Sequence, residues 1–163
     1  MSAAFSVMVA KDYLNFAAAH FITMRGHQCE SLHGHNYRVG VTVEGALDPE
    51  CLWVMDFSAL KEILRPLVKV VDHRVILPAS NPKLTLEHRD GRVHVTVFGE
   101  ARYVFPERDC AILPLANSTA EMLAEHFGRE VQLALRAREV RDVTRLAIEI
   151  EESPGQTAIW ESR

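Results

Sequence analysis

Apolar and polar residues alternate in four parts of the chain. Between residues 37 and 44 three valines occupy every second position, with polar or small residues between them. The same period of two recurs from 146 to 151, and the segments 5–13 and 157–161 have strand-like composition. A period of two is typical of a strand that buries one face. The pattern therefore predicts four strands.

Two further stretches have apolar residues at three- and four-residue spacings, which predicts amphipathic helices. The first starts at Asp56 and contains Pro66, where we expect a kink or a helix end because proline lacks the backbone N–H donor. The second follows Asn117, and Ser118 and Glu121 have the spacing of a capping box. The apolar positions are Phe57, Leu60, Ile63, Leu64, Leu67, Val68 and Val71 in the first helix, and Ala120, Leu123, Ala124, Phe127, Val131, Ala134 and Leu135 in the second.

Between the two helices the pattern is shorter. Residues 78–90 have loop-like composition, and the alternating runs 93–98 and 101–105 are separated by Gly99-Glu100, which indicates a β-hairpin. No repeat or linker divides the sequence, so we expect one domain over residues 1–163. The order of elements favours an α+β fold, with an antiparallel four-stranded sheet, two helices on one face and an inserted hairpin.

Composition narrows the functional class. The 163 residues are 48% hydrophobic and 25% charged, which is typical of a globular chain that buries its own core. The net charge is −4, so we expect neither a nucleic-acid partner nor binding to an anionic membrane. The apolar runs are too short to span a bilayer, and the first residues lack the pattern of a secretory signal. We therefore expect a cytoplasmic protein with Cys29, Cys51 and Cys110 as reduced thiols.

Three histidines are the first candidates for chemistry. His33 and His35 flank Gly34 directly before the predicted strand 37–44, and their parity matches that of its buried valines. If the strand begins early, the two imidazoles converge on one side, as zinc ligands do. A pair of core or turn histidines explains the pattern equally well. His20 would supply a third nitrogen, and a zinc site with three imidazoles leaves one position for substrate or water.

Cys29 lies four residues before His33, and two roles are open for it. As a fourth zinc ligand it would close the site and make it structural, whereas as a thiolate beside the metal it would act as a base. A base needs a partner that relays its proton, and Asp72 or His73 could reach it across a cleft. We do not expect these two neighbours to bond each other on a strand. Taken alone, the pair is more simply explained as a charged helix end.

Glu152 has the parity of the apolar residues between 146 and 150, so an uninterrupted strand would point its carboxylate inward. A buried carboxylate is costly unless it is paired. A flat heterocycle with neighbouring N–H donors would pair it. Alternatively, the strand ends at Glu151 and Glu152 is exposed. Glu121 also has a simpler explanation, as a residue that caps its helix.

The ordered set of these residues resembles the 6-pyruvoyl-tetrahydropterin synthase family. The short gap between Cys29 and His33 is similar to that of its bacterial branch, 6-carboxy-tetrahydropterin synthase of the queuosine pathway. The resemblance implies a tunnelling fold whose subunits close into trimeric barrels, two of which stack as a homohexamer. Relative to compact members, the segment 82–113 is an insertion. The matching stretches are Phe16-Ala17-Ala18-Ala19-His20, residues 29–37, Asp56-Phe57, Leu60-Lys61, Asp72-His73, residues 117–121 and Glu152-Ser153.

The resemblance also implies a role for each candidate residue. The proton relay could reach the thiol from across a subunit boundary. The implied assignments are Zn²⁺ at His20, His33 and His35, proton transfer at Cys29 with Asp72 and His73 as its relay, and pterin binding at Glu152 with Thr119 and Glu121.

The activity that the resemblance implies is that of a carbon–oxygen lyase. Its substrate would be 7,8-dihydroneopterin triphosphate, converted with loss of triphosphate to 6-carboxy-5,6,7,8-tetrahydropterin and acetaldehyde. Formation of 6-pyruvoyl-tetrahydropterin and aldolase-like cleavage of the dihydroneopterin side chain stay open. A non-catalytic zinc- or pterin-binding module is the alternative from another class. Cys29, Asp72 and His73 argue against it, because a pure binder needs no proton relay.

Overall fold

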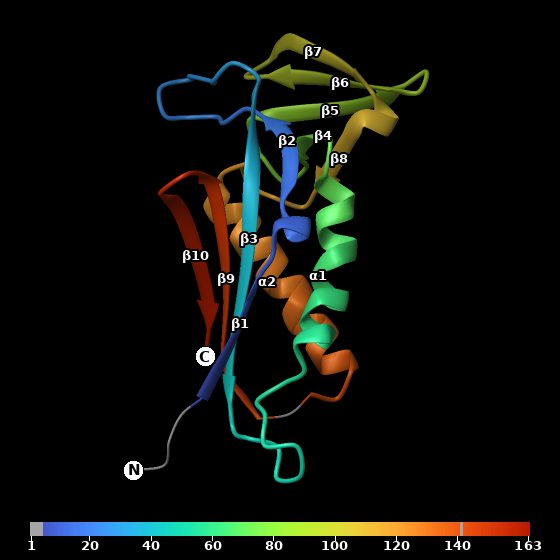
Figure 1. The fold of residues 1–163 in the computed structure, drawn as a ribbon. Helices are drawn as coiled ribbons and strands as arrows, with labels where there is room; N and C mark the ends of the chain where they lie inside the picture. Colours follow the sequence, from blue (N-terminus) through green and yellow to red (C-terminus); the bar gives the residue numbers. More distant parts are fainter. Residues whose placement is uncertain (1–4, 141) are drawn as a thin grey trace.

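The computed structural model describes residues 5–140 and 142–163. Helices pack on one side of a long sheet, and a small second sheet lies at one end of the molecule (Figure 1). The strands are β1 (Phe5–Ala10), β2 (Phe16–His20), β3 (His33–Gly45), β4 (Arg74–Pro78), β5 (Leu84–Arg89), β6 (Arg92–Val97), β7 (Glu100–Pro106), β8 (Cys110–Leu113), β9 (Val143–Ser153) and β10 (Gln156–Ser162). The helices are α1 (Phe57–Val71) and α2 (Ala120–Ala137), with short 3₁₀ turns η1 (Asp12–Leu14) and η2 (Glu107–Asp109).

The α+β fold is confirmed, but the main sheet is larger than predicted and is mixed. Its order is β10-β9-β3-β2-β4-β8, and β1 also pairs with β3, which makes seven strands. The pairings β2–β4 and β4–β8 are parallel, and the others are antiparallel. The expectation of four antiparallel strands was therefore wrong in number and in direction.

One strand that the pattern missed, β4, is short and contributes buried residues on both faces. In β4, Ile76 belongs to the core beneath the helices, whereas Leu77 belongs to a second core beneath the small sheet. A strand covered on both faces has consecutive apolar residues instead of alternating ones. Because β4 contributes to both cores, we infer that the chain folds as one domain.

The two helices cover the same face of the main sheet, as predicted (Figure 1). Asp56 caps α1 by accepting a hydrogen bond from the backbone N–H of Ser58 at 2.8 Å. The helix continues through Pro66, so it does not end there. Pro66 and Glu62 are both exposed, so the carbonyl of Glu62, which loses its helical donor, faces water. In α2, Gly128 lies directly against the ring of Trp160, which brings the helix close to β10.

The insertion forms a three-stranded antiparallel sheet, in the order β5-β6-β7. The predicted hairpin is present as β6 and β7, but the segment 78–90, interpreted as a loop, contains β5. Leu84 and Leu86 pack against the second core, and the rest of β5 is polar and exposed. Two apolar positions were too few to reveal a strand.

Among the described residues, no helix is both long and apolar enough to cross a membrane.

Candidate metal centre and pterin pocket

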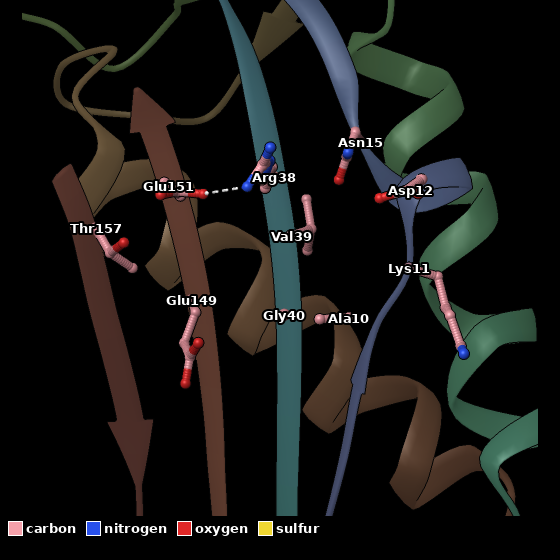
Figure 2. Close-up of a pocket in the computed structure, with 10 residues that line it drawn as sticks. All are labelled: Ala10, Lys11, Asp12, Asn15, Arg38, Val39, Gly40, Glu149, Glu151 and Thr157. Carbon is pink, nitrogen blue, oxygen red and sulfur yellow. Dashed lines mark hydrogen bonds and ion pairs between the residues drawn. The ribbon is translucent and has the colours of Figure 1, made fainter. Parts of the chain in front are cut away.

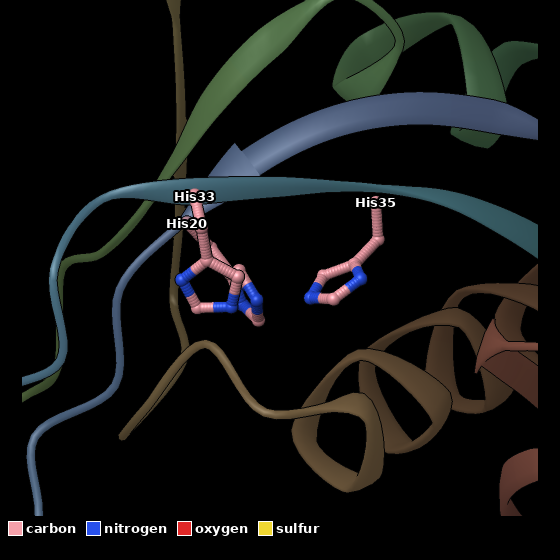
Figure 3. Close-up of side chains that lie close together, drawn as sticks. All are labelled: His20, His33 and His35. Atoms are coloured by element: carbon pink, nitrogen blue, oxygen red, sulfur yellow. The ribbon is translucent and has the colours of Figure 1, made fainter.

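Three imidazoles converge on the helix-covered face of the sheet. His20 and His33 are directly opposite each other in the β2–β3 pairing, and His35 follows two residues later on the same face. One ring nitrogen from each lies within 4.8 Å of the others. Figure 3 shows the three rings below the strands, turned toward the loop that begins α2. The strand does begin early, at His33, so the predicted convergence is present in the structure.

Backbone carbonyls fix which nitrogen of two rings is free. Nδ1 of His20 lies 2.6 Å from the carbonyl oxygen of Ser118, and Nδ1 of His33 lies 2.8 Å from that of Ser31. A carbonyl only accepts, so Nδ1 carries the proton and Nε2 presents its lone pair in the neutral ring. Burial lowers the pKa of His20, which favours the neutral ring. Neutral imidazoles oriented by carbonyls are the usual ligands of zinc and similar metals, so the residues present fit such an ion.

Small residues let the two histidine-bearing strands approach. A β-carbon at Gly34 would lie 3.2 Å from the carbonyl oxygen of Ala18, which is tighter than an ordinary contact. Two hydrogen bonds join the residues after β2 to the residues before α2. The hydroxyl of Ser118 donates to the carbonyl of Phe21 at 2.6 Å. The side-chain amide of Asn117 donates to the carbonyl of Thr23 at 3.0 Å. These bonds hold the Ser118 carbonyl against His20.

Cys29 is not part of the imidazole cluster. Among the described residues, the group of potential ligand atoms contains three nitrogens and no sulfur. The Cys29 thiol donates instead to the carbonyl of Glu30, at 3.3 Å. Burial raises the pKa of this thiol, and the nearby guanidinium of Arg102 acts in the opposite direction. The geometry therefore does not support Cys29 as a fourth ligand.

Asp72 and His73 bond each other, contrary to expectation. Nδ1 of His73 lies 2.9 Å from the Asp72 carboxylate. The contact forms because neither residue is on a strand: Asp72 is the C-cap of α1, and His73 has a φ of 57°, which turns its side chain back. Burial raises the pKa of Asp72, but the hydrogen bonds from the backbone of Ala17 and from His73 outweigh it, so the pKa is lowered.

The Asp72–His73 pair lies apart from the imidazoles within one chain. His73, whose side chain is 82% exposed, lines a shallow depression with Ala17, Ala19 and Gly34. Gly34 lies between the two histidines of β3, so this depression belongs to the opposite face of the sheet. Among the described residues, no hydrogen bond or ion pair joins Cys29 to either member of the pair.

Glu152 lies beside the imidazoles. β9 runs to Ser153, so Glu152 stays in the strand and its side chain is 22% exposed. The simpler alternative, an exposed Glu152 beyond the strand end, is therefore wrong. Its Oε1 lies 3.5 Å from Nε2 of His20 and 3.3 Å from the Tyr37 hydroxyl. The same hydroxyl lies 3.3 Å from Nε2 of His20, and burial raises the pKa of Tyr37 far above its ordinary range.

All three residues predicted to bind the substrate line one cavity of about 440 Å³. Glu152 forms one side of it, and Thr119 and Glu121 at the start of α2 form another. The expected capping box does not form, because α2 begins one residue later than predicted. Thr119, not Ser118, is the N-cap, and its hydroxyl accepts from the backbone N–H of Met122 at 3.4 Å. The carboxylate of Glu121 is thereby left for the cavity.

Two residues of the site, Glu30 and Tyr37, were not predicted from the sequence. Oε2 of Glu30 is buried, has no hydrogen-bond partner among the described residues and lies 4.0 Å from Nε2 of His33. Its position between Cys29 and His33 was a signal that could have identified it. Tyr37 has the same strand parity as the buried valines, so its position in the sequence indicates a core residue more than a functional one.

A second depression, of about 370 Å³, lies on the face of the sheet turned away from the helices (Figure 2). It is polar, and the Arg38 guanidinium pairs there with Glu151 at 3.5 Å. The imidazoles are on the other face, so this depression does not belong to the candidate site.

Comparisons with known proteins agree on one group. The family model described as 6-pyruvoyl tetrahydropterin synthase matches residues 9–163. A protein of Methanocaldococcus jannaschii, named putative 6-carboxy-5,6,7,8-tetrahydropterin synthase, is 30% identical over 90% of this chain and 89% of its own. The solved 6-pyruvoyl tetrahydropterin synthase of Plasmodium vivax is 30% identical, with a TM-score of 0.91 over 99% of both chains.

Two further comparisons bear on the chemistry. Other structures of the Plasmodium vivax protein are described as variants in which a catalytic glutamate is replaced by alanine or cysteine. A dihydroneopterin monophosphate aldolase of Pyrococcus furiosus is 40% identical over 37% of this chain and 49% of its own.

Proposed function

Because the chain belongs to the 6-pyruvoyl tetrahydropterin synthase family, we propose that it converts 7,8-dihydroneopterin triphosphate to 6-carboxy-5,6,7,8-tetrahydropterin with zinc as cofactor. The family and the named relatives indicate a lyase that acts on a pterin. The zinc and this particular substrate and product are the proposal.

One observation carries the proposal: the imidazole cluster and the cavity are adjacent, and Glu152 touches both. The Glu152 carboxylate lines the cavity and lies 3.5 Å from His20. A cavity of about 440 Å³ is within the usual range for sites of small ligands. A pterin ring held at Glu152 would therefore extend its side chain toward the metal ligands.

Each residue of the site has a separate role in the proposed reaction. His20, His33 and His35 would hold the zinc, which when bound supplies a Lewis acid for the side-chain oxygens of the substrate. Glu152 accepts hydrogen bonds from the N–H groups of the ring and orients it. Cys29 removes a proton from the carbon beside the side-chain hydroxyl, and triphosphate leaves by elimination with its C–O electron pair.

The relay to Cys29 is assigned to Asp72 and His73 of a neighbouring subunit. Within one chain the pair lies on the face of the sheet opposite the imidazoles, so the proposed relay to the metal site comes from a neighbouring chain. The uncovered face supports assembly, since Met8 and Ile159 on it are 51% and 61% exposed. Our proposal accordingly includes a homohexamer in the cytoplasm and a role in queuosine synthesis.

Glu30 favours a second candidate function, aldolase-like cleavage of the dihydroneopterin side chain. Its buried, unpartnered oxygen beside His33 provides a base in addition to Cys29. A relative named dihydroneopterin monophosphate aldolase supports this alternative. The two functions differ in their products. Aldolase cleavage gives a hydroxymethyl pterin and a glycolaldehyde that carries the triphosphate, whereas the synthase reaction takes up one water and gives a carboxylate, acetaldehyde and triphosphate.

To test this, zinc-loaded protein is incubated with 7,8-dihydroneopterin triphosphate, with and without a chelator, and every product is identified by mass spectrometry. The proposal predicts triphosphate, acetaldehyde and the 6-carboxy product, all lost on chelation. A hydroxymethyl or pyruvoyl pterin would support the corresponding alternative. No consumption of substrate by zinc-loaded protein would contradict the proposed function.

A further inference from the structure

The inserted sheet contacts the loop that carries Cys29. On β7, the guanidinium of Arg102 donates through Nη2 to the backbone carbonyls of Cys29, at 3.4 Å, and Glu30, at 3.1 Å. Its Nε donates to the hydroxyl of the adjacent Tyr103 at 3.0 Å. The same hydroxyl accepts from the backbone N–H of Leu32 at 3.2 Å. Two side chains of the insertion thus hold three of the four residues that precede His33.

The other backbone hydrogen bonds of this loop involve different groups. Among the described residues, Cys29 also forms an isolated antiparallel bridge with Thr23, in which Glu30 N–H donates to the carbonyl of Ile22 at 2.9 Å and Met24 N–H to that of Gln28 at 2.8 Å. The carbonyl of Ser31 lies 2.8 Å from the ring of His33. The thiol of Cys29 donates to the Glu30 carbonyl that Arg102 also contacts. The direction of the thiol is therefore coupled to the position of the guanidinium.

Apolar side chains of the inserted sheet also pack against the loop that carries Cys29. The ring of Tyr103 lies against those of Phe21 and Phe105, with centroids 5.2 and 5.5 Å apart. Cys29 and Leu32 pack against the core of the inserted sheet. The loop is therefore fixed by this sheet on its apolar side and by Arg102 and Tyr103 at its backbone.

We propose that Arg102 and Tyr103 are positioning residues for catalysis, and that the insertion 82–113 sets the placement of the Cys29 thiol relative to the imidazole cluster. This inference rests on the proposed function, in which Cys29 transfers the proton. It gives the insertion a role inside the site, and neither residue has to touch the substrate. A displacement of about 1 Å in a reacting group lowers a rate by about 100-fold, so the loss of these bonds has a large effect on turnover.

The shape of arginine matters here as well as its charge. Its planar fork reaches two carbonyls and a hydroxyl at once, whereas lysine offers one compact ammonium. Arg102→Lys therefore keeps the charge and loses part of the geometry. Tyr103→Phe keeps the ring packing and removes only the hydroxyl.

The experiment compares Arg102→Gln, Arg102→Lys and Tyr103→Phe with wild-type protein. Arg89→Gln is the matched control, because Arg89 is on the same sheet and its ion pair, at 2.9 Å, is to Glu87 of its own strand. Turnover of 7,8-dihydroneopterin triphosphate is measured per bound zinc, and amide hydrogen exchange is followed over residues 29–33. We expect kcat of Arg102→Gln to fall about 10- to 100-fold with KM within about twofold, and exchange in the segment to accelerate about 10-fold.

We expect Arg102→Lys to recover only part of the lost kcat, Tyr103→Phe to show a smaller loss of the same kind, and Arg89→Gln to match wild type. An Arg102→Gln variant with normal kcat, normal exchange or a changed KM alone would overturn the inference. So would full rescue by lysine, which would indicate charge instead of placement. If wild type consumes no substrate, the proposed function fails, and unaltered exchange in Arg102→Gln would still refute the positioning of the loop.

Discussion

Replacing Glu152 by glutamine tests the pterin pocket with little change in shape. The carboxylate is mostly buried and lies 3.3 Å from the Tyr37 hydroxyl and 3.5 Å from His20. Glutamine keeps the volume and removes the charge that would accept the ring N–H groups. Hydrogen bonds to a charged group contribute about 1.5 to 3 kcal/mol, which corresponds to a rise in Kd of about 10- to 150-fold.

The assay is a fluorescence titration with neopterin, followed by elemental analysis of bound metal. We expect weaker binding in Glu152→Gln at unchanged metal content. The matched control is Glu151→Gln, which alters the neighbouring residue on the opposite face, where it pairs with Arg38 at 3.5 Å. Equal affinities of Glu152→Gln and wild type, or equal losses in both variants, would refute the placement of the ring at Glu152.

Two predictions concern the fold. Gly128→Ala places a β-carbon against the ring of Trp160, so we expect overpacking to lower the free energy of unfolding by about 1 to 3 kcal/mol in urea titration, and an unchanged midpoint would contradict the close contact. Burial lowers the pKa of His126 below 6.5, so the unfolded chain takes up the proton first as the pH falls. Stability contributed by neutral His126 is thus complete above pH 6.5 and declines below it. His126→Asn should flatten this decline in unfolding titrations between pH 7 and 5, and an equal slope in both proteins would exclude His126 as its source.

The sequence predicted the elements whose patterns are local. The helices and the long strands bury one face each, so their apolar spacing is visible in the chain. β4 is buried on both faces, and its partner β8 has only four residues, so neither shows alternation. The helix start at Thr119 differed by one residue from the capping-box prediction, since both Ser118 and Thr119 can cap a helix.

The candidate site was predictable to a similar extent. Strand parity was enough to place His33, His35 and Glu152 on one face, whereas His20 lies on β2, a strand that the pattern did not predict. The position of Asp72 and His73 relative to the imidazoles depends on which sheet face each occupies, and spacing along the chain does not give it. The contacts of Arg102 join segments 72 residues apart, so only the folded chain reveals them.

The central claim is that three imidazoles hold the metal and that Cys29 acts beside it. The most direct test is the metal content of purified Cys29→Ala, measured together with its turnover and with His33→Ala as the comparison. The account predicts that Cys29→Ala keeps about one zinc per chain and loses turnover, while His33→Ala loses the zinc. Loss of zinc from Cys29→Ala would make the thiol a ligand and contradict the account.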